Sequence, residues 1–112
     1  AAAAAGNYRA QIALDLFVYT AATYIAAVTV SLGGLDAIIF TAGIGENDPE
    51  LREAVMKDFG WLGIEIDTEL NAKMLRQSNI VKLSTDNSKV AVYLIPTNEE
   101  YMIDLDTLNL VQ

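Results

Sequence analysis

Two short segments of the chain combine residue types suited to binding a nucleotide and a metal ion. Residues 43–47, Gly-Ile-Gly-Glu-Asn, follow an apolar run over residues 37–40, and residues 97–100, Thr-Asn-Glu-Glu, follow a second apolar run over residues 89–95. Glycine lets a backbone turn sharply or come close to a ligand, and carboxylates are the hard oxygen ligands that magnesium takes. Both segments are therefore candidate parts of a ligand site, provided that the fold brings them together.

The two apolar runs indicate how the fold would do so. Neither run alternates between apolar and polar residues, which is typical of strands buried on both faces in a parallel sheet. If the strands are parallel in one sheet, their carboxyl ends meet at one edge, where open α/β sheets bind their ligands. The sequence thus predicts an α/β fold, with parallel strands flanked by helices, and one crevice lined by residues 43–47 and 97–100.

The glycine segment has no established nucleotide-binding signature. It lacks the third glycine of the dinucleotide fingerprint and the Gly-Lys-Ser/Thr of the P-loop, so a plain glycine turn that feeds a capped helix remains an open alternative. Glu46, Asp48 and Glu50 crowd this helix start with no nearby Lys or Arg, and they would repel a bare polyphosphate unless a metal or outside cations intervened. A neutral adenosine moiety, with ribose hydroxyls to grip, suits the segment better.

The acidic segment supplies one candidate metal ligand, Glu99. Acids in the first turn of a helix favour its dipole, and Glu100 lies three residues after Thr97 in capping-box spacing, so capping explains Glu100. Glu99 is freer, and it is a carboxylate of the kind that binds magnesium, often through a water molecule. Asn98 is placed to help position it.

Composition excludes several classes of site. The formal net charge is −8 with seven Lys and Arg, so the chain offers no basic surface for DNA, RNA or anionic lipid. Histidine and cysteine are absent, which excludes a self-contained hydrolase triad, a zinc site and disulfides. The absence of cysteine is compatible with a cytoplasmic protein. The alanine run at residues 1–5 has no targeting pattern and is interpreted as an artefact.

The expected elements alternate between helices and strands. Helices are expected over residues 7–31, from a cap at Asp48 to a stop at Gly60, from a cap at Asp67 onward and from Thr97 onward; strands are expected over 37–40, 80–83 and 89–95, with an extended connection at 61–66 and a polar hairpin turn at 84–88. Three strands leave open edges and partly covered apolar faces, so the chain is expected to be part of something larger or to need a partner.

Residues 16–35 contain no charged side chain, and a stretch of this length can span a membrane. Threonine, serine and glycine dilute its apolar character. We therefore expect a helix that is largely buried against the sheet, and no membrane partner.

Three motifs follow one another along the chain: Ala-Ile-Ile-Phe-Thr-Ala-Gly-Ile-Gly-Glu-Asn within residues 35–55, Trp-Leu-Gly-Ile at 61–64 and Leu-Ile-Pro-Thr-Asn-Glu-Glu at 94–100. In this order and separation they resemble the C-terminal part of the acetate kinase and propionate kinase family. Asn-Tyr-Arg-Ala at residues 7–10 is similar to the same family. Residues 1–112 are accordingly interpreted as the C-terminal part of its nucleotide-side domain, with no second domain.

The resemblance implies a kinase that moves the γ-phosphoryl group of ATP to acetate or propionate and forms an acyl phosphate. The implied architecture is a duplicated actin-like, ribonuclease H-like fold, with the nucleotide between domains and Mg²⁺ at the phosphates. The implied nucleotide contacts are Gly43, Ile44, Gly45, Glu46 and Asn47, and the implied magnesium ligand is Glu99. The family's dimer contacts largely involve this part, so the resemblance also implies a homodimer.

The chain also departs from the family. Family catalysis relies on arginines, a histidine and an aspartate from earlier in the polypeptide, whereas Arg9, Arg52 and Arg76 lie in none of these catalytic motifs. Because phosphoryl transfer needs such cations in its transition state, we expect the isolated chain to be inactive. Ala42 stands where many members have glycine. The glycine segment favours acetate or propionate over butyrate, and the alternative function is a non-catalytic dimerisation module on the same scaffold.

Overall fold

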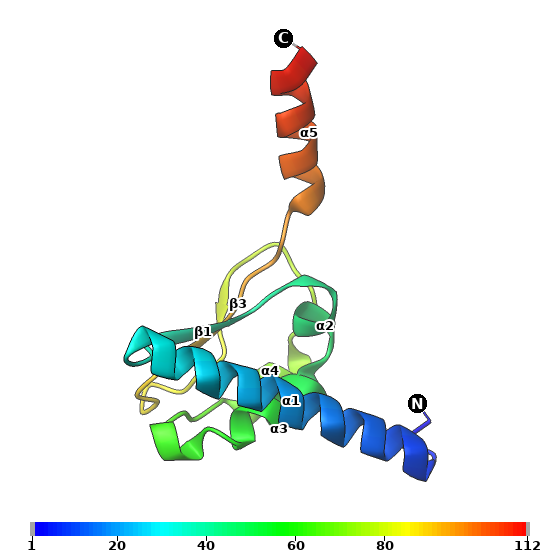
Figure 1. Ribbon diagram of the computed structural model, residues 1–112, viewed down its shortest axis with the longest axis vertical. Helices are drawn as coiled ribbons and strands as arrows, with labels where there is room; N and C mark the ends of the chain where they lie inside the picture. The colour runs from blue at the N-terminus through cyan, green and yellow to red at the C-terminus, as the bar shows by residue number, and fades with distance from the viewer. Residues whose placement is uncertain (1, 112) are drawn as a thin grey trace.

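A computed structural model of the chain describes residues 2–111, in which helices and strands are interspersed along the sequence (Figure 1). In chain order the elements are α1 (Tyr8–Leu32), β1 (Ala37–Phe40), α2 (Ala42–Asn47), α3 (Pro49–Lys57), the 3₁₀ helix η1 (Gly60–Leu62), α4 (Thr68–Lys73), β2 (Val81–Lys82), β3 (Ala91–Leu94) and α5 (Glu99–Val111). The described residues thus contain the three strands that the sequence predicts, with shorter bounds for β2 and β3.

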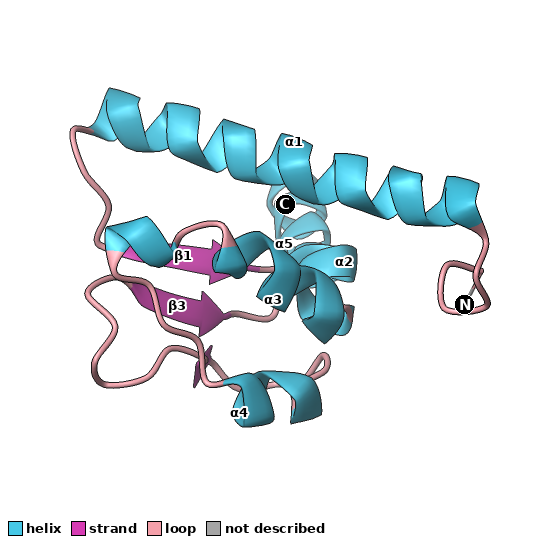
Figure 2. Ribbon diagram, turned by 90° about the horizontal axis from the view of Figure 1, so that it is seen from below, coloured by secondary structure: helices cyan, strands magenta, loops and turns pink. Residues whose placement is uncertain are grey.

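The sheet has the strand order β1-β3-β2. β1 and β3 are parallel, with Phe40 opposite Leu94, and they point the same way side by side in Figure 2. β2 pairs antiparallel with β3 across the predicted hairpin turn. The prediction of two parallel strands is therefore confirmed, and the segments that follow Phe40 and Leu94 leave the sheet at the same edge.

The core lies on one side of the sheet. Val92 and Leu94 of β3 are buried with Val55, Met56 and Phe59 from α3 and the turn after it. On β1, however, Ile39 is 55% exposed while Ile38 is buried. The prediction that both strands are buried on both faces is therefore wrong. No described element covers the second face of β1, and on the same face of β3 Ala91 and Tyr93 are only partly buried.

The helices that support the sheet begin where capping residues predict. The Asp48 carboxylate accepts the Leu51 amide at 2.9 Å ahead of α3, and the Asp67 carboxylate accepts the Leu70 amide at 2.9 Å ahead of α4. These bonds satisfy amides that lack a partner in the first helical turn. Both predicted caps are confirmed.

The end of α3 differs from the prediction. The helix ends at Lys57, and Gly60 starts η1 instead of stopping α3. The expected extended connection over 61–66 is therefore wrong in its first half, where the chain forms a 3₁₀ turn that ends at Gly63 with φ of 74°. In the second half of this connection, Ile66 forms an isolated antiparallel β-bridge with Ser84.

Helix α1 is not buried as predicted. Asn7 caps its start and Gly33, in the left-handed conformation, ends it, yet none of its described residues is buried. One strip of small and branched residues, from Val18 to Ala26, packs partly on the core, and the helix lies across α3. By length and composition α1 could cross a membrane, with a mean hydropathy of 1.6. Core helices of soluble proteins and signal sequences satisfy the same criteria.

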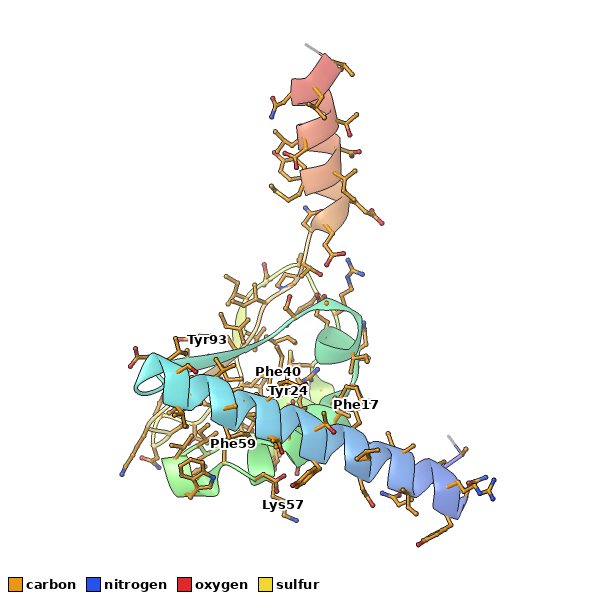
Figure 3. The ribbon with its side chains drawn as sticks, viewed as in Figure 1. Phe17, Tyr24, Phe40, Lys57, Phe59 and Tyr93 are labelled. Atoms are coloured by element: carbon orange, nitrogen blue, oxygen red, sulfur yellow. The ribbon has the colours of Figure 1, made fainter. Side chains whose placement is uncertain are left out.

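Helix α5 stands away from the rest of the molecule, and its side chains project free of the other elements (Figures 1 and 3). None of its described residues is buried. The helix begins at Glu99, and the Asn98 side chain accepts the Tyr101 amide at 3.3 Å. The predicted cap at Thr97 is therefore wrong: the Thr97 hydroxyl is a donor in a bond to another segment, which leaves Asn98 to cap the helix.

The packing asymmetry of the sheet predicts unequal effects of two truncations. Leu94→Ala removes a side chain that is 1% exposed, and it should lower the free energy of unfolding by about 2–5 kcal/mol through lost burial and the cavity left behind. Ile39→Ala, the matched control on the open face, should cost less than about 1 kcal/mol. Urea denaturation of the chain measures both values, and equal losses would contradict the one-sided core.

Candidate functional site

The glycine segment forms a short helix and not the predicted turn. Residues 42–47 make up α2, and Ala42 enters it with φ of 61°, a left-handed conformation that is uncommon for alanine. The Asn47 side chain donates to the Gly43 carbonyl at 2.9 Å. A Cβ on Gly45 would lie 3.4 Å from the Phe40 backbone, which is an ordinary van der Waals contact, so α2 packs against the end of β1 without leaving a gap at this position.

Glu46 joins the two candidate segments. Its side chain is 1% exposed, and its Oε1 atom accepts both the amide and the hydroxyl of Thr97 at 2.9 Å each. The Oε2 atom makes no hydrogen bond within the described residues and lies 3.5 Å from Nε of Arg76. These contacts bridge 51 positions of sequence, so the predicted convergence of residues 43–47 and 97–100 at one edge is a feature of the structure.

The same contacts keep Glu46 ionised. The hydrogen bond from the Thr97 amide lowers the pKa of the Glu46 carboxyl below its ordinary value of 4.5, and burial opposes this effect. The Thr97 hydroxyl, the Ala42 backbone and the charge of Arg76 lower the pKa further. At neutral pH the group is a carboxylate that holds Thr97 through charge-assisted hydrogen bonds.

A polar hollow of about 170 Å³ opens where the segments meet. Its lining residues are Ala42, Gly43, Arg76, Thr97, Asn98, Glu99 and Glu100. Of the predicted site residues, Gly43 and Glu99 line this hollow. Ile44, which is 53% exposed, lines a different, apolar hollow, and Asn47 is exposed outside the lining. Gly45 is half-buried and Glu46 is buried, and neither belongs to the lining.

Arg76 and Arg52 correct an expectation about charge. The sequence predicts no cation beside the glycine segment. The fold nevertheless brings Arg76 to the wall of the hollow and Arg52 to the Gly45 carbonyl. A cation at the wall offsets part of the repulsion between Glu46, Asp48 and a phosphate group. The folded chain therefore repels a phosphate-bearing ligand less than the sequence predicts.

Arg52 is a buried connector that sequence reasoning missed. Its guanidinium is fully buried and donates to the carbonyls of Gly45 at 2.8 Å and Met74 at 2.6 Å, and to the Asn71 side chain at 2.8 Å. Asn71 in turn donates to the Pro49 carbonyl at 2.8 Å. Burial lowers the pKa of Arg52, and Asp48 raises it. An arginine among the apolar residues of α3 is the one sequence signal that could have revealed this network.

Two carboxylates, those of Glu99 and Glu100, belong to the lining of the hollow. Within residues 2–111, no three His, Cys, Asp or Glu side chains come together as a metal site. Magnesium commonly uses one or two carboxylates, with waters and substrate phosphates as its other ligands. Glu99, exposed at the rim beside Asn98, fits that requirement as a single protein ligand.

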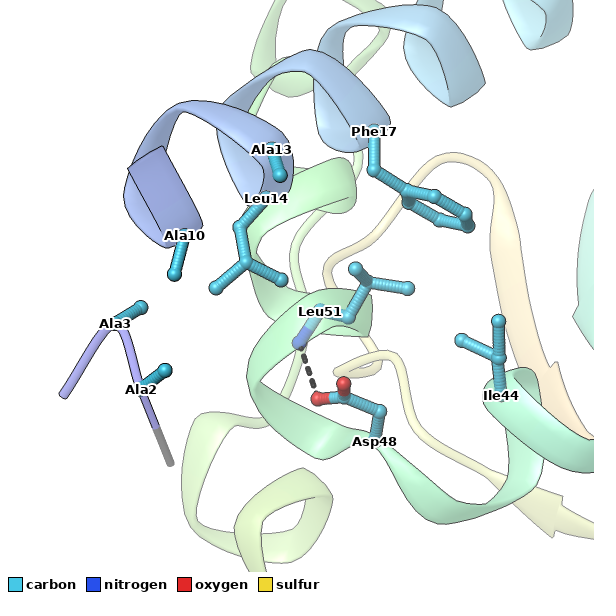
Figure 4. Close-up of a pocket in the computed structure, with 9 residues that line it drawn as sticks. All are labelled: Ala2, Ala3, Ala10, Ala13, Leu14, Phe17, Ile44, Asp48 and Leu51. Carbon is cyan, nitrogen blue, oxygen red and sulfur yellow. Dashed lines mark hydrogen bonds between the residues drawn. The ribbon is translucent and has the colours of Figure 1, made fainter. Parts of the chain in front are cut away.

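A separate, apolar hollow of about 410 Å³ lies between α1 and the start of α3 (Figure 4). Apolar side chains such as Leu14, Phe17, Ile44 and Leu51 line it. Asp48 is its only charged lining residue, and that carboxylate already accepts the Leu51 amide. Among the described residues, the lining of this hollow therefore offers a ligand one charged group, the Asp48 carboxylate, of which the Oδ1 atom is already hydrogen-bonded.

Known proteins match this chain in sequence and in fold. The model of the acetokinase family matches residues 1–105. Acetate kinase of Clostridium novyi is 49% identical over 111 residues, which are 99% of this chain and 27% of that protein. Acetate kinase of Pseudothermotoga lettingae is 48% identical over 111 residues, with the same coverage.

Solved structures show the same similarity. A crystal structure of Porphyromonas gingivalis acetate kinase superposes on 99% of this chain and 27% of its own, with a TM-score of 0.85 and 37% identity. A propionate kinase from Francisella tularensis covers 90% of the chain and 25% of its own, with a TM-score of 0.77 and 34% identity. The predicted α/β fold of these kinases is thus confirmed. The chain belongs to the acetokinase family, and it spans about 27% of the length of the relatives named above.

The lowered pKa of Glu46 predicts a pH-dependent contribution to stability. Since the folded pKa lies below 4.5, the carboxylate stabilises the fold above that pH, and this contribution is lost as the pH falls through the folded pKa. Denaturation of Glu46→Gln over a pH series should therefore show a smaller loss of stability on acidification than the unmodified chain does. Glu53→Gln, at an exposed position of α3, is the control and should keep the original slope.

Proposed function

We propose that the chain is the C-terminal part of the nucleotide-side domain of an ATP:acetate or ATP:propionate phosphotransferase. One observation carries the proposal: the Glu46–Thr97 hydrogen bonds bring the glycine segment and the acidic segment to the rim of one polar hollow. Family membership supplies the reaction class, which is transfer of the γ-phosphoryl group of ATP to a short carboxylate with formation of an acyl phosphate. A cytoplasmic location belongs to the same proposal.

The residues at the rim take separate roles in this proposal. Gly43, Ile44 and Gly45 let the backbone of α2 approach the nucleotide, and Asn47 helps to fix that backbone through its bond to Gly43. Glu99 holds Mg²⁺, directly or through water. When bound, the ion neutralises charge on the transferring phosphates.

In this proposal, the cations that phosphoryl transfer requires come from another part of the enzyme. Arg76, the cation at the hollow, has a side chain that is 63% exposed and ion-paired with Glu46, so it is a weak substitute for the cations that phosphoryl transfer requires. The remainder of the polypeptide would supply those groups. The isolated chain would therefore be inactive, and the complete enzyme would act as a homodimer.

The second candidate is a non-catalytic interaction module, and the exposed apolar side chains of α5 favour it. Large apolar side chains stand exposed on α5: Tyr101, Met102, Ile103, Leu108, Leu110 and Val111. Exposed apolar surface of this extent commonly marks a contact with another protein surface. In the kinase proposal the same surface meets the remainder of the polypeptide or a second subunit.

Nucleotide binding distinguishes the two candidates. Titration calorimetry with ADP and Mg²⁺ should detect binding to the chain, and Glu99→Ala should weaken the Mg²⁺-dependent affinity about tenfold, the usual size of a lost charged contact. Asp104→Ala, which removes an exposed carboxylate further along α5, should leave the affinity unchanged. Self-association without any nucleotide signal would instead support the interaction module.

Complementation tests the reaction itself. The chain alone should give no ADP-dependent turnover of acetyl phosphate above the uncatalysed rate, because the catalytic cations are missing. Addition of the N-terminal three quarters of an acetate kinase relative should restore turnover. The Glu99→Ala chain in the same complex is the control and should restore much less. A correctly folded complex without turnover would count against the kinase proposal.

A further inference from the structure

We propose that the Glu46 side chain is a positioning residue: it does not touch the nucleotide, and it acts through Thr97 to set the place of Glu99. This role rests on the proposed function, since it concerns the presentation of a magnesium ligand. It also separates Glu46 from Gly43, Ile44, Gly45 and Asn47, whose predicted nucleotide contacts remain unchanged.

Burial and hydrogen bonding argue against a ligand contact by Glu46. With 1% of its surface exposed, the side chain presents almost nothing to the hollow. Its Oε1 atom already accepts two hydrogen bonds from Thr97, and its Oε2 atom faces Arg76 at 3.5 Å. Glu46 is accordingly absent from the lining of the hollow, whereas Thr97, Asn98 and Glu99 belong to it.

Thr97 is the last point at which the chain is fastened before α5. The Ile95 amide donates to the Phe40 carbonyl at 3.0 Å, and the next hydrogen bonds to another segment are the two from Thr97 to Glu46. After Thr97, the described hydrogen bonds lie within the α5 start itself, such as those from the Tyr101 and Met102 amides to Asn98. The position of Glu99 relative to α2 therefore depends on the hydrogen bonds that Thr97, two residues upstream of Glu99, makes with the Glu46 carboxylate.

This arrangement links the two halves of the site mechanically. Glu46 sits on the same short helix as Gly43 and Gly45, so a single rigid element both faces the nucleotide and holds the root of the magnesium ligand. Without the tie, residues 97–99 gain backbone freedom that a bound ion must then restrict. Loss of the tie should thus weaken the contribution of Mg²⁺ to nucleotide binding more than it weakens binding of the nucleotide alone.

The first arm of the test needs no ligand. Amide hydrogen exchange of the chain should show the Thr97 amide exchanging about tenfold faster, or more, in Glu46→Ala, as expected when a hydrogen bond to a charged acceptor is lost. Glu46→Gln keeps an acceptor oxygen and should rescue part of the protection. Glu53→Ala, which removes an exposed carboxylate from α3, is the matched control. The Val92 amide, bonded to Ser84, should keep its rate and so report an intact core.

The second arm measures how much Mg²⁺ increases ADP affinity in the chain joined with the remainder of its polypeptide. Glu46→Ala should lower that enhancement about tenfold, and Glu46→Gln should lower it less. Thr97→Val removes the hydroxyl donor but keeps the amide, so it should have a smaller effect than Glu46→Ala. The effect of the double variant should fall short of the sum of the two single effects, because both act through one contact.

Each outcome decides the question. Loss of Thr97 protection together with a reduced Mg²⁺ enhancement supports the positioning role. Unchanged Thr97 protection in Glu46→Ala overturns it, whatever the nucleotide data show. A loss of Mg²⁺-free ADP affinity with an unchanged enhancement overturns it too, and assigns Glu46 to the nucleotide. If the unmodified protein shows no Mg²⁺-dependent ADP binding, the proposed function fails and the positioning role fails with it, while the exchange data still report the Glu46–Thr97 tie.

Discussion

Parallel pairing of β1 with β3 is the constraint on which the site depends. Because Phe40 lies opposite Leu94, two segments that are far apart in sequence leave the sheet at one edge and in one direction. An antiparallel pair would have sent them to opposite ends. The Glu46–Thr97 hydrogen bonds then convert shared location into direct contact. A three-stranded sheet thus forms a polar rim out of two short segments.

Beneath that rim, the Arg52 guanidinium holds α2, α3 and α4 together. Its hydrogen-bond acceptors are backbone carbonyls and the Asn71 amide oxygen, so its charge is balanced mainly by dipoles, with Asp48 as the nearby carboxylate. Removing one member of such a buried network leaves the other polar groups without partners. The position of the rim therefore depends on the hydrogen bonds of Arg52 as well as on the apolar core.

The sequence predicted the features that depend on neighbouring residues. Asp48 and Asp67 were identifiable as caps because a cap lies next to the helix that it serves, and the apolar runs identified β1 and β3. The prediction failed where the outcome depends on distant partners. Threonine is a common capping residue, yet the Thr97 hydroxyl donates a hydrogen bond to Glu46, which lies 51 positions earlier in the sequence. Arg52 and Arg76 were assigned no role, since folding alone brings them to α2. The predicted burial of α1 and of the second face of β1 is wrong because no described element packs over those surfaces.

The backbone conformation of Ala42 affects the stability and the freedom of the start of α2. Ala42 adopts a left-handed backbone conformation that costs alanine about 1–2 kcal/mol and that glycine would adopt with little cost. In exchange, its methyl group narrows the range of shapes open to the start of α2. Strain and restriction act at the same residue, so the start of α2 is held in one backbone conformation at a cost to the stability of the fold.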